Sequence, residues 1–207
     1  MLTLEKVLHL YSTDPEAEFT IRQISQKLKT AYGYVYERMS EFIKQGIFIV
    51  KKVGNANICT LNFKNPILPT RMAEVLALEC KDFLKNDPVT AKLFNEFISK
   101  VEEKTNFSLY SVILFGSFAK GTSHKKSDID ILILVSSKKE FDEIIHQECG
   151  SLEMQYGRNI NPVIMTPEMY LKMMQSSEEN LGKQILKNKI ILSGGEKYWQ
   201  LTLEAMK

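Results

Sequence analysis

The sequence predicts an α+β protein of 207 residues, with a helical unit first and a mixed sheet flanked by helices second. Apolar residues recur at helical spacing in residues 4–43 and again in residues 70–104. Two later apolar runs, residues 112–115 and 129–135, have the length and the β-branched content of buried strands. Hydrophobic residues make up 44% of the chain and charged residues 25%, which is typical of a soluble protein with a packed core.

Residues 1–64 are predicted to form the first domain, of three helices followed by a β-hairpin. Thr20 and Gln23 have the spacing of a capping box that begins the second helix. Thr30 is expected to begin the third helix, and Gly46 to end it. The hairpin is expected to turn at Gly54-Asn55. The expected elements lie at residues 4–11, 20–28, 30–45, 47–53 and 58–63.

Residues 65–105 are predicted to hold two linker helices, and residues 106–207 the second domain. Asn65-Pro66 marks the boundary, and Asn86-Asp87-Pro88 separates the two helices. Pro162 indicates an edge or irregular position in its strand, because proline lacks the N–H that a central strand must donate. The expected elements of this part lie at residues 70–85, 89–104, 112–115, 129–135, 138–149, 159–165, 166–175, 178–187, 190–192 and 196–203.

The chain carries no pattern of a membrane or secreted protein. No apolar run reaches the length of a membrane span, and the first residues include an acid and lack a long apolar segment. The three cysteines are far apart, without the spacing of a zinc site, and fit a reducing compartment. We therefore expect a cytoplasmic protein with no membrane partner.

Residues 111–135 concentrate the polar groups that indicate chemistry. Asp128 and Asp130 stand two apart, so on a strand their carboxylates share one face. Two such charges repel, and a divalent cation such as Mg²⁺ or Mn²⁺ relieves the repulsion through oxygen ligands that it also takes from phosphates. Gly116-Ser117 follows a strand, where glycine permits close approach to a phosphate and a helix start offers free N–H donors. The stretch therefore predicts a metal-nucleotide site.

This stretch resembles the signature of the DNA polymerase β-like nucleotidyltransferases, and in particular the minimal nucleotidyltransferases. The shared pattern is Gly116-Ser117, ten residues, and then Asp128-Ile129-Asp130, with Ala119, Gly121 and Ser127 matching as well. The alternative is an ordinary hairpin whose aspartates are solvated turn residues. The strand–turn–helix context favours the nucleotidyltransferase interpretation.

The resemblance implies a transferase that moves a nucleoside monophosphate from an NTP, with ATP favoured, to a hydroxyl of a protein or small molecule. A two-metal, in-line displacement would supply the rate. Asp128 and Asp130 would hold the metal, with Lys126 as an alternative to Lys120 beside the phosphates. Minimal nucleotidyltransferases are often antitoxins of a HEPN-type toxin, some by adenylylating it, so such a toxin is an implied partner. The residues expected at the nucleotide are Gly116, Ser117, Lys120 and Ser127.

One departure from the family pattern concerns the third carboxylate that these enzymes commonly carry on a neighbouring strand. The matching position here is Asn161, which we include among the catalytic candidates. An amide can bind a metal through its oxygen, but it has no charge and is not a useful base. Nucleotide binding is therefore expected to survive while transfer is weakened. Glu153 and Glu168 are the alternative third acids.

The first domain resembles a winged helix-turn-helix, in which the third helix enters the DNA major groove and the hairpin contacts the backbone. Residues 1–64 hold nine Lys and Arg against six Asp and Glu, and Glu37 and Glu41 on the third helix would repel phosphate. A role of this domain in protein contacts without DNA is the alternative, and a homodimer is a further possible assembly. The second functional hypothesis is thus a DNA-binding regulator, or antitoxin-like protein, that senses nucleotide without turnover. The residues expected at duplex DNA are Lys29, Tyr34, Arg38, Lys51 and Lys52.

Overall fold

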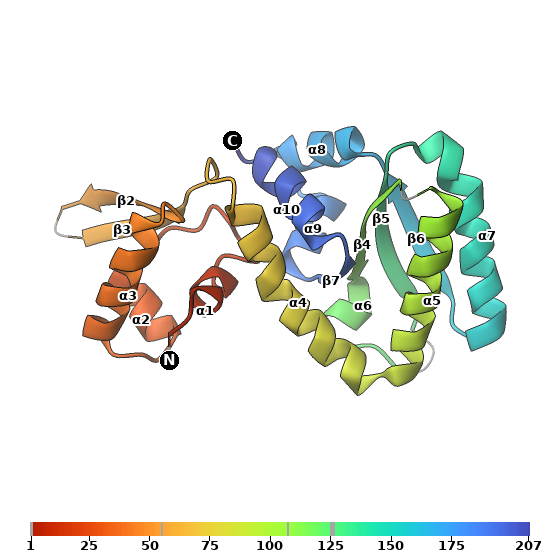
Figure 1. Ribbon diagram of the computed structural model, residues 1–207, viewed down its shortest axis with the longest axis horizontal. Helices are drawn as coiled ribbons and strands as arrows, with labels where there is room; N and C mark the ends of the chain where they lie inside the picture. The colour runs from red at the N-terminus through yellow and green to blue at the C-terminus, as the bar shows by residue number, and fades with distance from the viewer. Residues whose placement is uncertain (1, 55, 107, 125–126) are drawn as a thin grey trace.

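The computed structural model describes residues 2–54, 56–106, 108–124 and 127–207. A smaller N-terminal unit precedes a larger unit in which helices cover both faces of a four-stranded sheet (Figure 1). The long helix α4 (Leu68–Asn86) runs between them and packs on both α1 (Leu4–His9) and α10 (Gly195–Glu204). One apolar cluster accordingly continues from the N-terminal unit through α4 to one side of the sheet. None of the described helices combines the length and the apolar run that crossing a membrane requires.

The N-terminal unit contains three helices and a small antiparallel sheet of order β1-β3-β2. Thr20 and Gln23 form the expected capping box at the start of the second helix. Gly46, with φ of 72°, lies just beyond the third helix as predicted. Its elements besides α1 are β1 (Phe19–Thr20), α2 (Ile21–Lys27), α3 (Tyr32–Lys44), β2 (Phe48–Val53) and β3 (Ala56–Leu61).

The start of α3 differs from the expectation. Ala31, and not Thr30, is the residue at the N-cap. The Thr30 hydroxyl donates to the carbonyl of Leu28 at 2.9 Å, while its own carbonyl accepts from the Ser25 hydroxyl at 2.7 Å. These bonds hold Thr30 in the turn after α2, so its side chain cannot cap the next helix. Asn55, predicted in the hairpin turn, lies outside the described residues.

The larger unit is built on a sheet of order β6-β5-β4-β7. Only β5 and β6 run parallel, and the other two pairs are antiparallel. Strand β6 is at an edge, as Pro162 predicted. The strands are β4 (Leu109–Phe115), β5 (Ile129–Val135), β6 (Ile160–Met165) and β7 (Ile190–Ser193).

Alternation along β5 divides the core into two layers. Ile131 and Ile133 pack on one face against α5 (Pro88–Lys104) and α7 (Lys138–Tyr156), whereas Leu132 and Leu134 belong to the cluster that includes α4 and α10. Asp130 shares the even-numbered face of Leu132, so its carboxylate is directed to the α4 and α10 side of the sheet. The strand pattern thereby fixes the face on which the signature acids lie.

The remaining helices refine the predicted boundaries. Helix α5 contributes Phe94 and Phe97 to the core beneath β4 and β5, so it packs on the sheet of the larger unit. Helix α7 runs past the expected end at 149, to a left-handed Gly157 with φ of 64°. Helix α9 begins three residues later than expected, because the Asn180 side chain caps it by accepting from Lys183 N–H. The other two are α6 (Gly116–Ala119) and α8 (Pro167–Gln175), and α9 itself spans Leu181–Lys187.

Candidate active site

Asp130 and Asn161 are direct neighbours across the parallel pair of β5 and β6. The Asn161 side-chain N–H donates to Asp130 Oδ1 at 3.3 Å. The Asn159 side chain in turn donates to Asn161 Oδ1 at 3.3 Å. The amide that stands where a third acid was expected therefore holds the Asp130 carboxylate by a hydrogen bond. Asp128 lies immediately before β5 and is exposed, two residues from the half-buried Asp130.

Gly116 joins the other half of the signature to this carboxylate. Its φ is 69°, a left-handed conformation that favours glycine. A Cβ at this position would lie 2.2 Å from Asp130 Oδ2, so the acid packs directly on the glycine backbone. Phe115 pairs with Asp130 across β4 and β5, and α6 begins at Gly116. Two sequence segments fourteen residues apart are thus placed in contact by strand pairing.

The loop between α6 and β5 is closed by its own hydrogen bonds. Thr122 N–H donates to the carbonyl of Ser117 at 3.0 Å, and His124 N–H donates to the Ser127 hydroxyl oxygen at 2.9 Å. In this structure the Ser127 hydroxyl oxygen accepts from backbone, while Ser117 lies half-buried in the first turn of α6. Lys126, the alternative phosphate partner, lies outside the described residues.

A groove of about 340 Å³ opens beside Gly116. Lys120 lines it from the signature side, and α9 with the residue after it supplies the opposite wall. No local pattern indicates this wall, because α9 begins far beyond the end of β5 in the chain and is brought to the groove by the pairing of β7 with β4. The α9 wall consists of Leu181, Gln184, Lys187 and Asn188.

Arg158 also lies beside the signature, and no sequence pattern indicated it. Its guanidinium donates to the Thr90 hydroxyl at 3.0 Å, lies 3.4 Å from Asp87 Oδ2 and stands over the ring of Phe118 in α6. Partial burial acts to raise the pKa of Asp87, but hydrogen bonds from Thr90 and the charge of Arg158 hold that pKa below its usual value. Arg158 thus fastens the start of α5 and the helix after Gly116 to the entry of β6.

Neither alternative acid takes the place of the third carboxylate in this structure. Glu153 Oε1 accepts from Ile160 N–H at 2.7 Å and so fixes the start of β6. Glu168 follows the far end of β6, and the four-residue rise from Asn161 to Met165 alone separates the two ends by about 13 Å. Within the described part of the chain, no group of three or more His, Cys, Asp or Glu is placed to hold one metal ion.

The residues expected at DNA lie on the N-terminal unit, apart from this site. Arg38 forms an ion pair with Glu41 and stands over the ring of Phe42, so its charge is partly compensated. The Tyr34 hydroxyl accepts from the backbone N–H of Leu2 at 3.3 Å. Lys51 and Lys52 are exposed neighbours on β2, whose side chains leave opposite faces of the strand. Lys29 has φ of 49° in the turn between α2 and α3.

Comparison with known proteins shows relatives over the part of the chain that carries the signature. The family model of the nucleotidyltransferase domain matches residues 94–192, from within α5 to β7. A protein of Methanocaldococcus jannaschii named "Putative protein adenylyltransferase" is 31% identical over 120 residues, covering 56% of this chain and 79% of the relative. A second protein with that name from the same organism is 36% identical over 81 residues, covering 39% of this chain and 78% of the relative.

A solved structure, described as a toxin-antitoxin with AMP-PNP, aligns with 54% of this chain and 84% of the other at 23% identity and a TM-score of 0.38. The family assignment does not depend on it. It follows from the relatives of at least 30% identity, most of whose length this chain spans, and from the signature that the fold assembles. The chain belongs to the nucleotidyltransferase domain family.

Proposed function

We propose that this protein transfers a nucleoside monophosphate from Mg-NTP, with ATP favoured, to a hydroxyl of a protein. The observation that carries the proposal is the direct packing of Asp130 on Gly116 beside the groove that α9 closes. The relatives named as protein adenylyltransferases support a protein acceptor. A HEPN-type toxin is the acceptor that the sequence resemblance suggests.

The donor set fits a hard divalent cation. Asp128 and Asp130 offer carboxylate oxygens within two residues, and the glycine at 116 leaves the space beside Asp130 that any side chain would fill. Mg²⁺ or Mn²⁺ bound there would neutralise phosphate charge and stabilise charge that develops during transfer. Asn161 orients Asp130, while Gly116 and Ser117 present backbone and hydroxyl donors to phosphate. Lys120 adds positive charge along the groove.

The Asn161→Asp substitution tests whether the amide limits transfer. The new carboxylate would face Asp130 where a hydrogen bond of 3.3 Å now lies, so without metal the pair should repel and lower the melting temperature. Mg²⁺ should restore the melting temperature, and transfer should rise about tenfold or more above a weak wild-type rate. Incorporation of label from α-labelled ATP into protein measures the rate, with differential scanning fluorimetry for stability.

The Asn161→Ala variant is the matched control, because it removes the hydrogen bond without adding charge. It should lose transfer and gain nothing from Mg²⁺ beyond the wild type. Strong wild-type transfer that no substitution at position 161 changes would show that the third ligand lies elsewhere and that Asn161 has no part in the reaction.

A second candidate function, duplex DNA binding, concerns the N-terminal unit alone. It is favoured by the exposure of Lys51 and Lys52 on β2 and opposed by the ion pair of Arg38 with Glu41. The combined Arg38→Ala and Lys51→Ala variant should bind the duplex DNA upstream of the protein's own gene about tenfold more weakly at low salt. The affinity of the wild type should fall steeply as salt rises. Gel retardation measures both. Absence of any wild-type retardation at low salt would leave the unit as a protein-contact module.

A further inference from the structure

Lys189 is a buried lysine at the point where the N-terminal unit meets α9. The residue is 8% exposed. The ammonium donates to the carbonyl of Ser12, just beyond α1, at 2.7 Å and to the carbonyl of Leu186, in the last turn of α9, at 2.8 Å. It also lies 4.9 Å from the centroid of the Trp199 ring. One side chain thus fastens a segment of the N-terminal unit to the end of α9, an arrangement we call the Lys189 junction.

Both chain neighbours of Lys189 connect it to the groove. The preceding residue, Asn188, lines the groove opposite Gly116. The following residue, Ile190, pairs with Leu114, two residues before Gly116 on β4. A displacement of Lys189 therefore moves both the α9 wall and the strand that carries the glycine turn.

The charge at this junction is weakly compensated. Burial lowers the pKa of Lys189 to about 7, and the charge of Glu79 on α4 offsets only part of that effect. Glu79 is itself paired with His9 of α1 at 2.8 Å. The α10 side presents the rings of Trp199 and Tyr198, the latter 6.0 Å from the ammonium, and burial holds the pKa of Tyr198 well above its usual value. Carbonyl oxygens and rings are poor substitutes for water around an ammonium.

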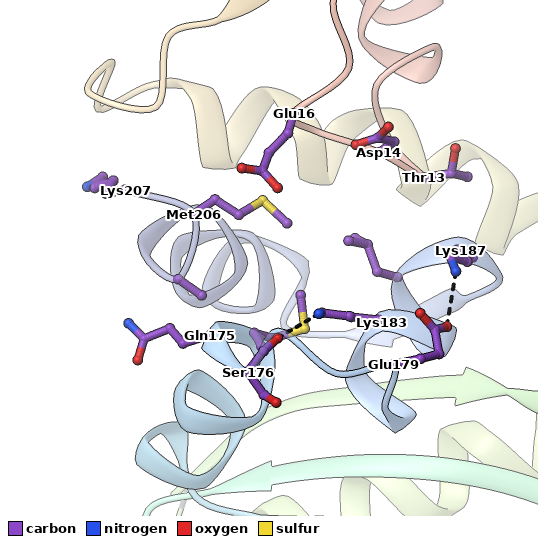
Figure 2. Close-up of a pocket in the computed structure, with 13 residues that line it drawn as sticks. Thr13, Asp14, Glu16, Gln175, Ser176, Glu179, Lys183, Lys187, Met206 and Lys207 are labelled. Atoms are coloured by element: carbon purple, nitrogen blue, oxygen red, sulfur yellow. Dashed lines mark hydrogen bonds and ion pairs between the residues drawn. The ribbon is translucent and has the colours of Figure 1, made fainter.

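Beyond Ser12 the two units do not pack closely. A hollow of about 860 Å³ separates residues 13–16 from α9 and the end of the chain. Figure 2 shows Asp14 and Glu16 on one side of it, with Lys183 and Lys187 on the other. The nearby lysines are engaged on their own side, Lys183 with the Ser176 carbonyl at 2.6 Å and Lys187 with Glu179 at 3.0 Å. The buried Lys189 junction lies beside this hollow, which Thr13 and Leu186 line next to the two carbonyls that Lys189 binds.

We propose that Lys189 couples the seating of the N-terminal unit to nucleotide binding in the groove, a regulation that rests on the proposed function. In the seated state Lys189 is buried between the two carbonyls and α9 is held against the groove. In the released state its side chain is in water and the segment after α1 is free to move. Nucleotide that contacts the α9 wall favours the seated state, and by linkage the seated state binds nucleotide more tightly.

Protonation sets the balance between these two states. The lysine in water has its ordinary pKa of 10.5, whereas the seated lysine has a pKa of about 7. Release therefore takes up a proton between these two values. The penalty on the seated state is fully present below pH 7 and is relieved as the pH rises toward 10.5. Acidification accordingly favours release, and alkaline pH favours seating.

The only tryptophan of the sequence, Trp199, reports on this proton directly. Wild-type emission measured from pH 5.5 to 9 should titrate with a midpoint near 7. The Lys189→Met variant should lose the transition, while the matched Lys197→Met variant, which changes an exposed lysine two residues from Trp199, should keep it. Glu79→Gln should lower the midpoint, because Glu79 favours the charged lysine. A flat wild-type profile, or a transition that persists in Lys189→Met, would overturn the assignment.

Hydrogen exchange of the wild-type protein at pH 8 tests the coupling without any variant. Mg-ATP should slow exchange in residues 4–16 as well as in residues 181–188. Protection of 181–188 with no change in 4–16 would overturn the coupling. If Mg-ATP does not bind at all, the proposed function and the coupling that rests on it both fail, while the tryptophan titration still decides the proton site.

The pH dependence of nucleotide affinity tests the coupling a second way. From pH 8 to pH 6, wild-type affinity for Mg-ATP should fall about fivefold or more relative to the affinity of the Lys189→Met variant. The comparison with the variant removes the contribution of the nucleotide's own titration. Equal pH dependence in the two proteins would contradict the proposal.

Discussion

Replacing both signature acids, Asp128→Ala with Asp130→Ala, is expected to abolish nucleotide-dependent stabilisation and nucleotidyl transfer. In the wild type, Mg-ATP at a hundredfold excess over its Kd should raise the melting temperature by about 5–10 °C through mass action. The double variant should show no such rise. Transfer should fall about a thousandfold or more, because the loss of about 4 kcal/mol of metal-assisted charge stabilisation corresponds to that factor.

The double variant should fold at least as well as the wild type without nucleotide. Asp128 is exposed and Asp130 is half-buried, so their removal opens no large cavity and relieves repulsion between neighbouring carboxylates. Asp142→Asn on α7 is the control, since this half-exposed acid forms long ion pairs of 3.9 and 3.8 Å with Lys138 and His146, away from the signature. An equal melting shift in the double variant and in the control would refute the assignment of the nucleotide site.

The Gly194→Ala variant should lose about 3 kcal/mol or more of unfolding free energy, a fall of about 10 °C in the melting temperature. Gly194 precedes α10 with φ of 68°, and an added Cβ would lie 1.8 Å from the carbonyl oxygen of Tyr110. That carbonyl belongs to β4, so relief of the overlap must displace the strand that leads to Gly116. Ser111 also donates to the Gly194 carbonyl at 2.7 Å and holds this contact closed.

Gly157→Ala separates the effect of backbone conformation from that of the contact. Gly157 has a similar φ of 64°, but a Cβ there would have no heavy atom within 4 Å. Its replacement should cost only about 1 kcal/mol, the usual penalty for an L-residue in the left-handed region. Thermal or urea unfolding of the two variants gives the comparison. Equal losses of unfolding free energy in the two variants would show that β4 shifts at little cost and that the contact of Gly194 with Tyr110 does not contribute to stability.

Sequence alone determined the signature region of this protein to a large extent. Gly116, Asp128 and Asp130 were identified because glycine conformational freedom and paired carboxylates are local properties, legible within one strand–turn–strand segment. Capping by Thr20 and termination at Gly46 followed for the same reason, since each depends on residues within four positions. The placement of Asn161 beside Asp130 needed only the assumption that two strands run side by side, which the structure provides. The roles of these residues, the division of the chain into domains and the DNA contacts of the N-terminal unit stay predictions.

Only the tertiary structure decided the parts that depend on long-range contact. The α9 wall of the groove, the bridging of α5, α6 and β6 by Arg158, and the burial of Lys189 against Ser12 join residues that are distant in the chain. Neither the charge of Lys189 nor its neighbours in sequence distinguish it from Lys183 or Lys187, which are half-buried and exposed, respectively, on the preceding helix α9. The difference arises because β7 pairs with β4, and this pairing places Lys189, the residue before β7, at the contact between the two units. Strand order is a property of the whole fold, so no local pattern predicts it.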